Sequence, residues 1–155
     1  MSDPLLAPLT ALGNDTPVVV TIGGITICEN PNLAIASLAA RKDRGAELHS
    51  KLQADAEVQL PDPGKVIFAK DVAAVWTGID QWFLLAPISD HPDYAAVVKS
   101  IVADSASVTE QTDGWVVFEI AGNNLIPLLE RLCNLNSKSL SAGDATRCLI
   151  EHLGC

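Results

Sequence analysis

The sequence predicts an α+β fold in which helices pack on one face of a mainly antiparallel sheet. Short apolar runs of strand length recur along the chain, and segments with apolar residues at helical spacing separate them. Several strand runs follow one another directly across short turns, which favours hairpins over the strict alternation of a doubly wound parallel sheet. The length of 155 residues fits one domain that can bury its own core.

The first half of the chain predicts an arm, a hairpin and a helix. Residues 1–16 contain two prolines and a polar cluster, so we expect a flexible N-terminal arm ahead of a domain over residues 17–155. Residues 16–28 predict two short strands that meet at Gly23 and Gly24. Asn30 and Pro31 predict a helix start. The apolar stripe of this helix, which is expected to bend near Gly45, contains Leu33, Ile35, Leu38, Ala39, Leu48 and Leu52.

The second half predicts further strands and two helices. The strands are expected over residues 65–70, 72–76, 81–86, 106–111 and 114–121, the last two forming a pair around Thr112 and Asp113. The helices are expected from residues 90–92 to 101 and over residues 125–132. Residues 142–153 are compatible with either a strand or a helix.

The charge of the chain excludes two classes of partner. Ten Lys and Arg stand against 19 Asp and Glu, which gives a formal charge of -9, and the basic residues cluster only at positions 41–44. Such a chain lacks the cationic surface of a nucleic-acid or anionic-membrane binder. The longest apolar stretch, residues 18–28, is shorter than the roughly 20 residues of a transmembrane helix. The first residues lack the basic start of a signal peptide, so a cytoplasmic location is expected.

The apolar content suggests a core or a contact surface. Hydrophobic residues make up 48% of the chain, and its mean hydropathy is +0.26. This excess fits either a well-filled core or an apolar face that a partner covers. Trp76 and Trp82 flank a predicted turn, where tryptophans either cap a core or lie at an interface. With Arg41 from the basic cluster, they are the residues that we expect at a partner interface.

No motif predicts catalysis or a cofactor site on this chain. A dinucleotide fingerprint, a phosphate-binding loop and a nucleophile elbow are all missing from the sequence. Cys148, His152 and Cys155 would share one face of a helix, and Cys133 would be the fourth ligand of a zinc ion there. These cysteines and Cys28 form no CxxC pair, so reduced thiols are the preferred interpretation and no metal site is predicted.

Several segments, in this order, carry a resemblance to a known family. They are LAAR at residues 38–41 with Gly45, LPDPGKV at 60–66, AVWTGIDQWFLLAP at 74–87, DGWVVFEIAG at 113–122, LLERLCNLN at 128–136 and SLSAGDATR at 139–147. Together they resemble the gamma subunit of heterotetrameric sarcosine oxidase. The most specific stretch, Trp-x-Gly-x-Asp-x-Trp at residues 76–82, recurs loosely in the folate-binding family of the glycine-cleavage T-protein and of the N-terminal domain of tRNA-modifying GTPases.

The resemblance implies a T-protein-like fold and a structural role without catalytic residues. It implies alpha, beta and delta subunits as partners, in an enzyme that demethylates sarcosine oxidatively to glycine, transfers the one-carbon unit to tetrahydrofolate and passes electrons through flavin to oxygen. FAD, FMN, NAD and tetrahydrofolate are expected on the partner subunits and none on this chain. Family members continue past the position of Arg147 with two strands and a helix, so we expect residues 17–155 to form a truncated domain.

Two other functions stay open from the sequence. The first is an independent folate-binding domain for one-carbon transfer, in which Arg41, Arg131 or Arg147 would meet the glutamate tail of folate. The second is a stand-alone scaffold domain with an unrelated partner.

Overall fold

The structure, a computed structural model, describes residues 9–155. Its strands are β1 (Val19–Ile22), β2 (Ile25–Glu29), β3 (Leu33–Ala40), β4 (Val66–Phe68), β5 (Ala73–Gly78), β6 (Gln81–Pro87), β7 (Ala106–Glu110), β8 (Phe118–Gly122), β9 (Leu149–Ile150) and β10 (Leu153–Gly154). Its helices are α1 (Gly45–Ala56), α2 (Tyr94–Val102) and α3 (Leu125–Leu132), with short 3-10 helices η1 (Thr112–Gly114) and η2 (Ser137–Ser139).

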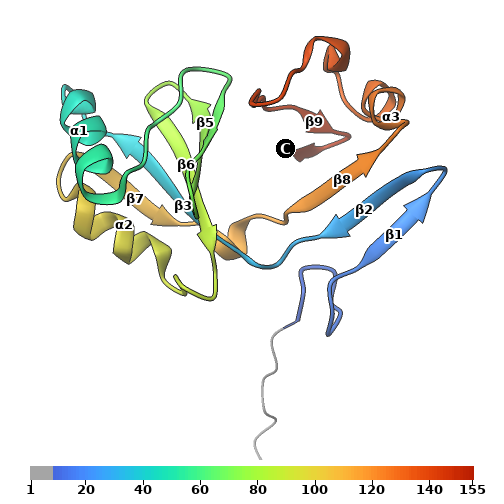
Figure 1. Ribbon diagram of the computed structural model, residues 1–155, viewed down its shortest axis with the longest axis horizontal. Helices are drawn as coiled ribbons and strands as arrows, with labels where there is room; N and C mark the ends of the chain where they lie inside the picture. The colour runs from blue at the N-terminus through green and yellow to red at the C-terminus, as the bar shows by residue number, and fades with distance from the viewer. Residues whose placement is uncertain (1–8) are drawn as a thin grey trace, which may run out of the picture.

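The elements form two halves that lie side by side (Figure 1). The first half is a five-stranded sheet of order β4-β5-β6-β3-β7 with α1 and α2; the second is a three-stranded sheet of order β1-β2-β8 with α3. A two-stranded hairpin, β9-β10, follows near the C-terminus. Every strand pair is antiparallel, which confirms the α+β class. The strands form three sheets where the sequence predicted one.

The segment from Leu33 to Ala40 is a strand, so the helix predicted there is wrong. It is β3, and it pairs with β6 on one side and β7 on the other. Every second residue of this strand, Ala34, Ala36 and Leu38, lies on the face that packs in the hydrophobic core. Ile35 lies on the opposite face. The helical spacing in this stretch arises because a strand that is apolar on both faces matches several periodicities at once.

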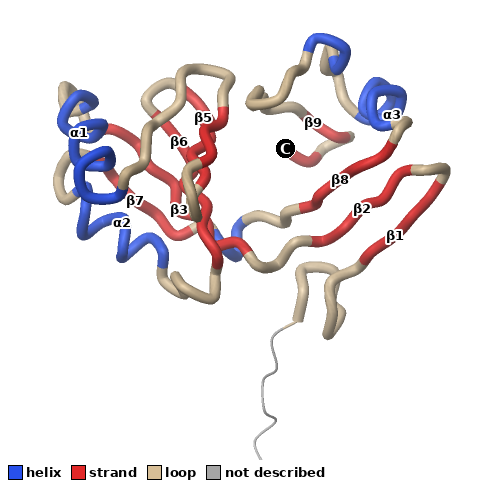
Figure 2. The backbone as a smooth tube through the Cα atoms, viewed as in Figure 1, coloured by secondary structure: helices blue, strands red, loops and turns tan. Residues whose placement is uncertain are grey.

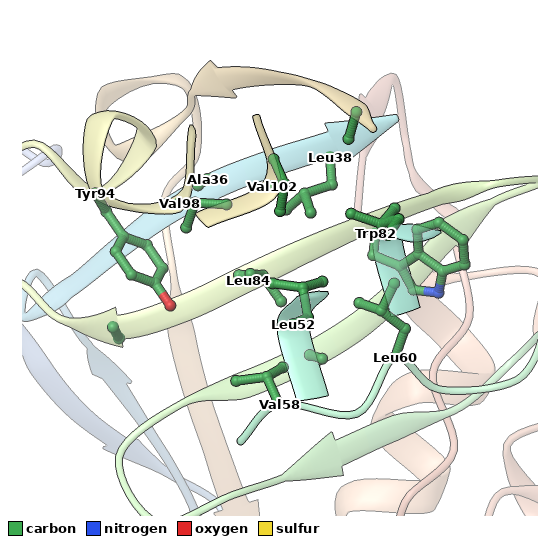
Figure 3. Packing of buried hydrophobic residues seen from close by; sticks show 14 of the residues in the cluster. Ala36, Leu38, Leu52, Val58, Leu60, Trp82, Leu84, Tyr94, Val98 and Val102 are labelled. Atoms are coloured by element: carbon green, nitrogen blue, oxygen red, sulfur yellow. The ribbon is translucent and has the colours of Figure 1, made fainter. Parts of the chain in front are cut away.

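The hydrophobic core lies between the five-stranded sheet and its two helices (Figure 3). Along β6, Trp82, Leu84 and Ala86 are buried against this core, whereas Phe83 and Leu85 lie on the opposite face. The buried members of the core are Ala34, Ala36, Leu38, Leu48, Leu52, Val58, Leu60, Ala74, Trp82, Leu84, Ala86, Tyr94, Val98, Val102 and Ala106. All of them belong to the first half of the molecule.

The two helices of the first half present one buried stripe each. Helix α1 begins at Gly45, where the sequence predicted a bend, and buries Leu48 and Leu52. Helix α2 confirms the predicted helix in this region and buries Tyr94, Val98 and Val102, which recur every fourth residue. The carboxylate of Asp93 accepts a hydrogen bond of 3.0 Å from the Ala96 N–H and caps this helix.

The second half begins with the predicted hairpin. Gly23 and Gly24 both have positive φ, 57° and 79°, which a two-residue turn between twisted strands requires. The strand predicted from residue 114 begins later, as β8, and it pairs with β2. It does not pair with β7, so the predicted strand pair around Thr112 is wrong: residues 111–117 cross from one sheet to the other, with the Gln111 N–H bonded to the Ile35 carbonyl.

The second half, whose strands β1, β2 and β8 lie beside α3 (Figure 2), contains little buried apolar surface. All four residues of β1 are exposed, and α3 buries none of its residues although its apolar side chains lie at helical spacing. Cys133, directly after α3, is the only apolar residue beyond β7 that is buried in the part of the chain that the structure describes. The packed core of this protein therefore stabilises one half only.

Both ends of the described chain are bound to the sheets. The predicted arm lies partly outside the described residues, and its flexibility stays a prediction. The buried carboxylate of Glu29 accepts the N–H groups of Leu12 at 3.1 Å and Val18 at 3.2 Å. Burial raises the pKa of Glu29, but the hydrogen bonds from Val18 and Leu12 outweigh it and hold the pKa below its usual value.

The C-terminal segment, which the sequence left open, forms a strand hairpin. Before it, residues 143–145 run along the free edge of β4: the Val66 N–H bonds to the Gly143 carbonyl at 3.0 Å, and the Ala145 N–H to the Gly64 carbonyl at 2.9 Å. Lys65 and Asp144 form an ion pair of 2.6 Å at the same place. The end of the chain thus spans the gap between the two halves, as Figure 1 shows.

Candidate functional site: an apolar cleft between the two halves

A cleft of about 410 Å³ lies between the face of the five-stranded sheet that no helix covers and the second half of the molecule. One wall consists of the residues of β3, β5 and β6 that point away from the core, Ile35, Val75, Phe83 and Leu85. The opposite wall contains Phe118 and Ile120 of β8, and the C-terminal segment adds Arg147, Ile150 and Cys155. Both sheets and the chain end are therefore needed to build it.

Two aromatic residues connect the walls of the cleft. Trp115, in the crossing segment between the sheets, lies edge-on to Phe83 of β6, with ring centroids 5.3 Å apart and planes at 72°. Such a T-shaped contact is favourable beyond the area that it buries. Trp76 of β5 lines the same cleft and also packs against the hydrophobic core. Indole and phenyl rings thus form much of its surface.

The cleft has a single charged side chain among its described lining residues. Arg147 lies there, and its guanidinium donates a hydrogen bond of 3.4 Å to the Thr77 carbonyl. None of the other described lining residues has a charged side chain, and the thiol of Cys155 lies among them. A surface of this kind can take apolar side chains and one acceptor group.

The structure separates the three residues predicted for a partner interface. Trp76 lines the cleft. Trp82 is only 6% exposed, donates its indole N–H to the Pro61 carbonyl at 3.0 Å and contacts His49 edge-on, so it caps the core and is not available to a partner. Arg41 is exposed and lies 3.5 Å from Asp104 in an ion pair, away from the cleft.

The three arginines considered for a folate tail do not come together. Arg41 precedes α1, Arg131 lies in the last turn of α3, and Arg147 alone lines the cleft. A polyglutamate tail is recognised by several cations around one path. The described part of this chain places one cation there.

The helix face proposed for zinc ligands does not form, because residues 148–155 are a hairpin. Cys148 and Cys155 lie opposite each other across it, while His152 lies in its turn. Between residues 9 and 155, no three His, Cys, Asp or Glu side chains are placed to hold a metal ion. The predicted helical face was therefore wrong. Cys148 and Cys155 are nevertheless close, because they are paired across the hairpin.

Sequence reasoning missed most of the residues that form the cleft. The alternation of Trp82, Phe83, Leu84 and Leu85 contains the signal, because every second residue of a strand points to the other face of its sheet. That signal does not say whether the second face is covered. The position of Phe118 and Ile120 opposite it depends on the pairing of β8 with β2, which joins distant parts of the chain.

The described helices include none that is long and apolar enough to cross a membrane. No protein-family model matches the chain, and no curated protein does. Among solved structures, it is similar to a chain of the heterotetrameric sarcosine oxidase from Corynebacterium sp. U-96, solved in complex with pyrrole 2-carboxylate. The TM-score is 0.69 at 19% identity, and the match covers 84% of this chain and 67% of that chain. The fold of this chain is thus similar to that of a sarcosine oxidase chain.

Proposed function

We propose that this chain is a non-catalytic subunit, of the gamma type, in a heterotetrameric complex that resembles sarcosine oxidase. The observation that carries the proposal is the similarity of fold over 84% of the chain to a chain of such a complex. The gamma assignment is supported by the sequence motifs, above all Trp-x-Gly-x-Asp-x-Trp at residues 76–82. The cleft agrees with a non-catalytic role because it combines apolar walls with one cation.

The uncovered second half supports a role in assembly. Val19 and Ile22 of β1 are 61% and 70% exposed, and Leu153 of the C-terminal hairpin is 72% exposed. A small sheet needs a hydrophobic face packed against another layer for its stability, and this sheet lacks one among the described residues. A partner that covers it would complete the missing layer, with a total buried area of about 1,600 Å² or more.

In this proposal the chemistry takes place on partner chains. The complex would oxidise an N-methyl amine such as sarcosine to glycine and pass the one-carbon unit to tetrahydrofolate. The flavins, NAD and tetrahydrofolate would be held by the alpha and beta subunits, with a delta subunit as the remaining partner. This chain would supply contact surface: its cleft would hold apolar side chains of a neighbour, and Arg147 would donate a hydrogen bond to one carbonyl or carboxylate there.

The proposal is tested by purifying the chain with an affinity tag from the cells that make it. We expect it to co-purify with chains that carry the visible absorbance of flavin and that consume oxygen when sarcosine is added. An Ile22→Asp variant should lose these chains and keep its circular dichroism, because Ile22 is exposed on β1. An Asp55→Ala variant, on the exposed side of α1, is the matched control and should retain them. A wild-type chain that purifies alone, as a monomer, would contradict the proposal.

A further inference from the structure

Three of the four cysteines lie around the C-terminal hairpin. Cys148 and Cys155 flank strands β9 and β10, and Cys133 forms an antiparallel bridge with Ile150 of β9. The fourth cysteine, Cys28, lies on β2 in the three-stranded sheet. All four are free thiols. The hairpin thus brings Cys148 and Cys155 close to Cys133, which lies at least 15 residues before them in the sequence.

The backbone holds Cys148 and Cys155 as a directly opposed pair. The Cys148 N–H donates to the Cys155 carbonyl at 2.8 Å, and the Cys155 N–H donates to the Cys148 carbonyl at 2.9 Å. Residues that exchange both hydrogen bonds across an antiparallel pair point to the same face, with Cα atoms about 5.5 Å apart. That separation lies inside the range of about 4.4–6.8 Å that disulfides span.

The same geometry makes such a disulfide reducible. Cβ atoms of opposed residues are about 4.5–5.5 Å apart, whereas a relaxed disulfide needs about 3.5–4.5 Å. The two strands therefore have to shift toward each other when the bond forms. Strained and exposed disulfides have higher reduction potentials and are the labile ones. A bond at this place would open again in the presence of ordinary thiols.

The environments of the two thiols assign them different roles. Burial raises the pKa of Cys148, and the thiol of Cys133, which shares a hydrogen bond with it, and then the thiol of Cys155 raise this pKa further, so the thiolate of Cys148 is disfavoured. Cys155 is exposed, and a thiol that reacts with a dissolved oxidant has to be accessible. Cys133 is buried and its thiol donates to the Leu129 carbonyl at 3.1 Å.

We propose that Cys148 and Cys155 form a reversible redox pair that a peroxide oxidises to a disulfide. The sulfur of Cys155 attacks one oxygen of hydrogen peroxide; the O–O bond breaks, the sulfur becomes a sulfenic acid, and water leaves once the departing hydroxide takes up the thiol proton. The sulfur of Cys148 then displaces the hydroxyl of that sulfenic acid, loses its proton and releases a second water. Two thiols and one peroxide thus give one disulfide and two waters.

The pair is placed where its oxidation changes the cleft. Ile150, Gly154 and Cys155 line the wall that the hairpin contributes. A disulfide across the hairpin restrains these residues and draws its two strands together. The inference does not depend on the proposed function, because it rests on the hairpin alone.

The test is a peptide map after brief treatment with dilute hydrogen peroxide, in which free thiols are alkylated before digestion with trypsin. Trypsin cleaves after Arg131, Lys138 and Arg147, so Cys148 and Cys155 share one peptide while Cys133 lies in another. We expect residues 148–155 to escape alkylation and to be lighter by two hydrogen atoms than the reduced peptide. Dithiothreitol should restore both thiols, and Cys28 and Cys133 should be alkylated throughout.

Three variants separate this pair from general thiol oxidation. Cys28→Ser should leave the oxidised peptide unchanged, whereas Cys155→Ser should abolish it. Cys148→Ser should leave Cys155 as a sulfenic acid, which dimedone traps. The proposal is overturned by a disulfide that joins the peptides of Cys133 and Cys148, by oxidation of Cys155 to sulfinic acid without any disulfide in the wild-type chain, or by equal oxidation of Cys28.

Discussion

At the scale of single residues, Gly122 allows β8 to lie close to the β1-β2 hairpin. Gly122 ends β8 with φ of +143°, in the region that side chains rarely adopt. A Cβ atom there would lie 2.2 Å from the Gly24 carbonyl oxygen and 2.9 Å from the Ile25 Cα. Both are backbone atoms of the β1-β2 hairpin and cannot move aside alone. The pairing of β8 with β2 therefore requires glycine at this position.

We expect Gly122→Ala to separate β8 from β2 and to lower the free energy of unfolding by about 1–3 kcal/mol, the usual cost of backbone strain and overpacking. Gly45→Ala is the matched control, because a Cβ at Gly45 meets nothing within 4 Å and alanine favours the first turn of a helix. Urea unfolding of the two variants measures the difference. Equal stabilities would contradict the close approach of β8 and the hairpin.

The two tryptophans of the Trp-x-Gly-x-Asp-x-Trp stretch are expected to act differently. Trp82→Ala removes a buried indole and should destabilise the chain by about 3–5 kcal/mol. Trp76→Ala should cost less stability, because Trp76 is only half-buried, and should weaken binding to a partner if the cleft is the contact surface. Thermal unfolding and co-purification of both variants test this. A Trp82→Ala chain with an unchanged melting curve would contradict the core position of Trp82.

At the scale of elements, the carboxylate of Glu110 connects the end of β7 to the start of α2. Glu110 at the end of β7 accepts the Ala95 N–H at 2.9 Å, at the start of α2, and the N–H groups of Gln111 and Thr112. Burial raises the pKa of Glu110, but the hydroxyl of Thr112 and these N–H groups outweigh it and lower the pKa below its usual value. Its negative charge thus stabilises the first turn of a neighbouring helix.

This arrangement predicts a pH-dependent contribution to stability. Because the pKa of Glu110 is lower in the folded chain, the contribution is fully present above the usual glutamate pKa of about 4.3 and is lost as the pH falls through the folded value. Glu110→Gln should therefore reduce stability by a few tenths to about 1 kcal/mol at neutral pH. The difference from wild type should shrink as the pH falls through the folded value, in urea titrations over a series of pH values. A difference that is constant with pH would rule out the charge of Glu110 as its source.

The ion pair of Lys65 and Asp144 is expected to hold the C-terminal segment on β4. The Lys65 ammonium, together with the Ser141 N–H, lowers the pKa of Asp144, so the attachment should weaken only in acid, as the pH falls through that lowered value. Asp144→Asn should accelerate hydrogen exchange at Val66 and Ala145, whose amides bond across this edge. Asp55→Asn, on the exposed side of α1, is the control. Unchanged exchange at Val66 and Ala145 would show that the backbone bonds alone hold the segment.

Local signals in the sequence predicted hairpins and helices, but not the partners of the strands. The glycine pair at residues 23–24 and the apolar spacing of α2 and α3 are decided by neighbouring residues, and the structure contains these elements where they were expected. The separation of β7 and β8 into different sheets depends on pairings with β3 and β2, in which the paired residues are at least 66 positions apart in the sequence. The strand β3 was predicted as a helix because its second face, which includes the cleft residue Ile35, is also apolar.

At the scale of the whole molecule, the two halves differ in how their apolar residues are used. The first half buries them between a sheet and two helices, whereas the second half exposes Val19, Ile22 and Leu132 at its surface. The composition allowed either a well-filled core or a contact surface, and the structure has a filled core in the first half and exposed apolar residues in the second. The sequence alone could not assign residues to one or the other, because burial depends on which faces the pairing of distant strands brings together.

Hydrogen exchange tests whether a partner covers the second half. Exchange is compared between the chain alone and the chain in the complex isolated from its own cells. We expect β1, α3 and the cleft residues of β8 to exchange quickly in the free chain and to gain protection in the complex, while the core around Leu38 and Leu84 is protected in both. Protection gained only over α1 and α2, or none in the second half, would contradict this expectation.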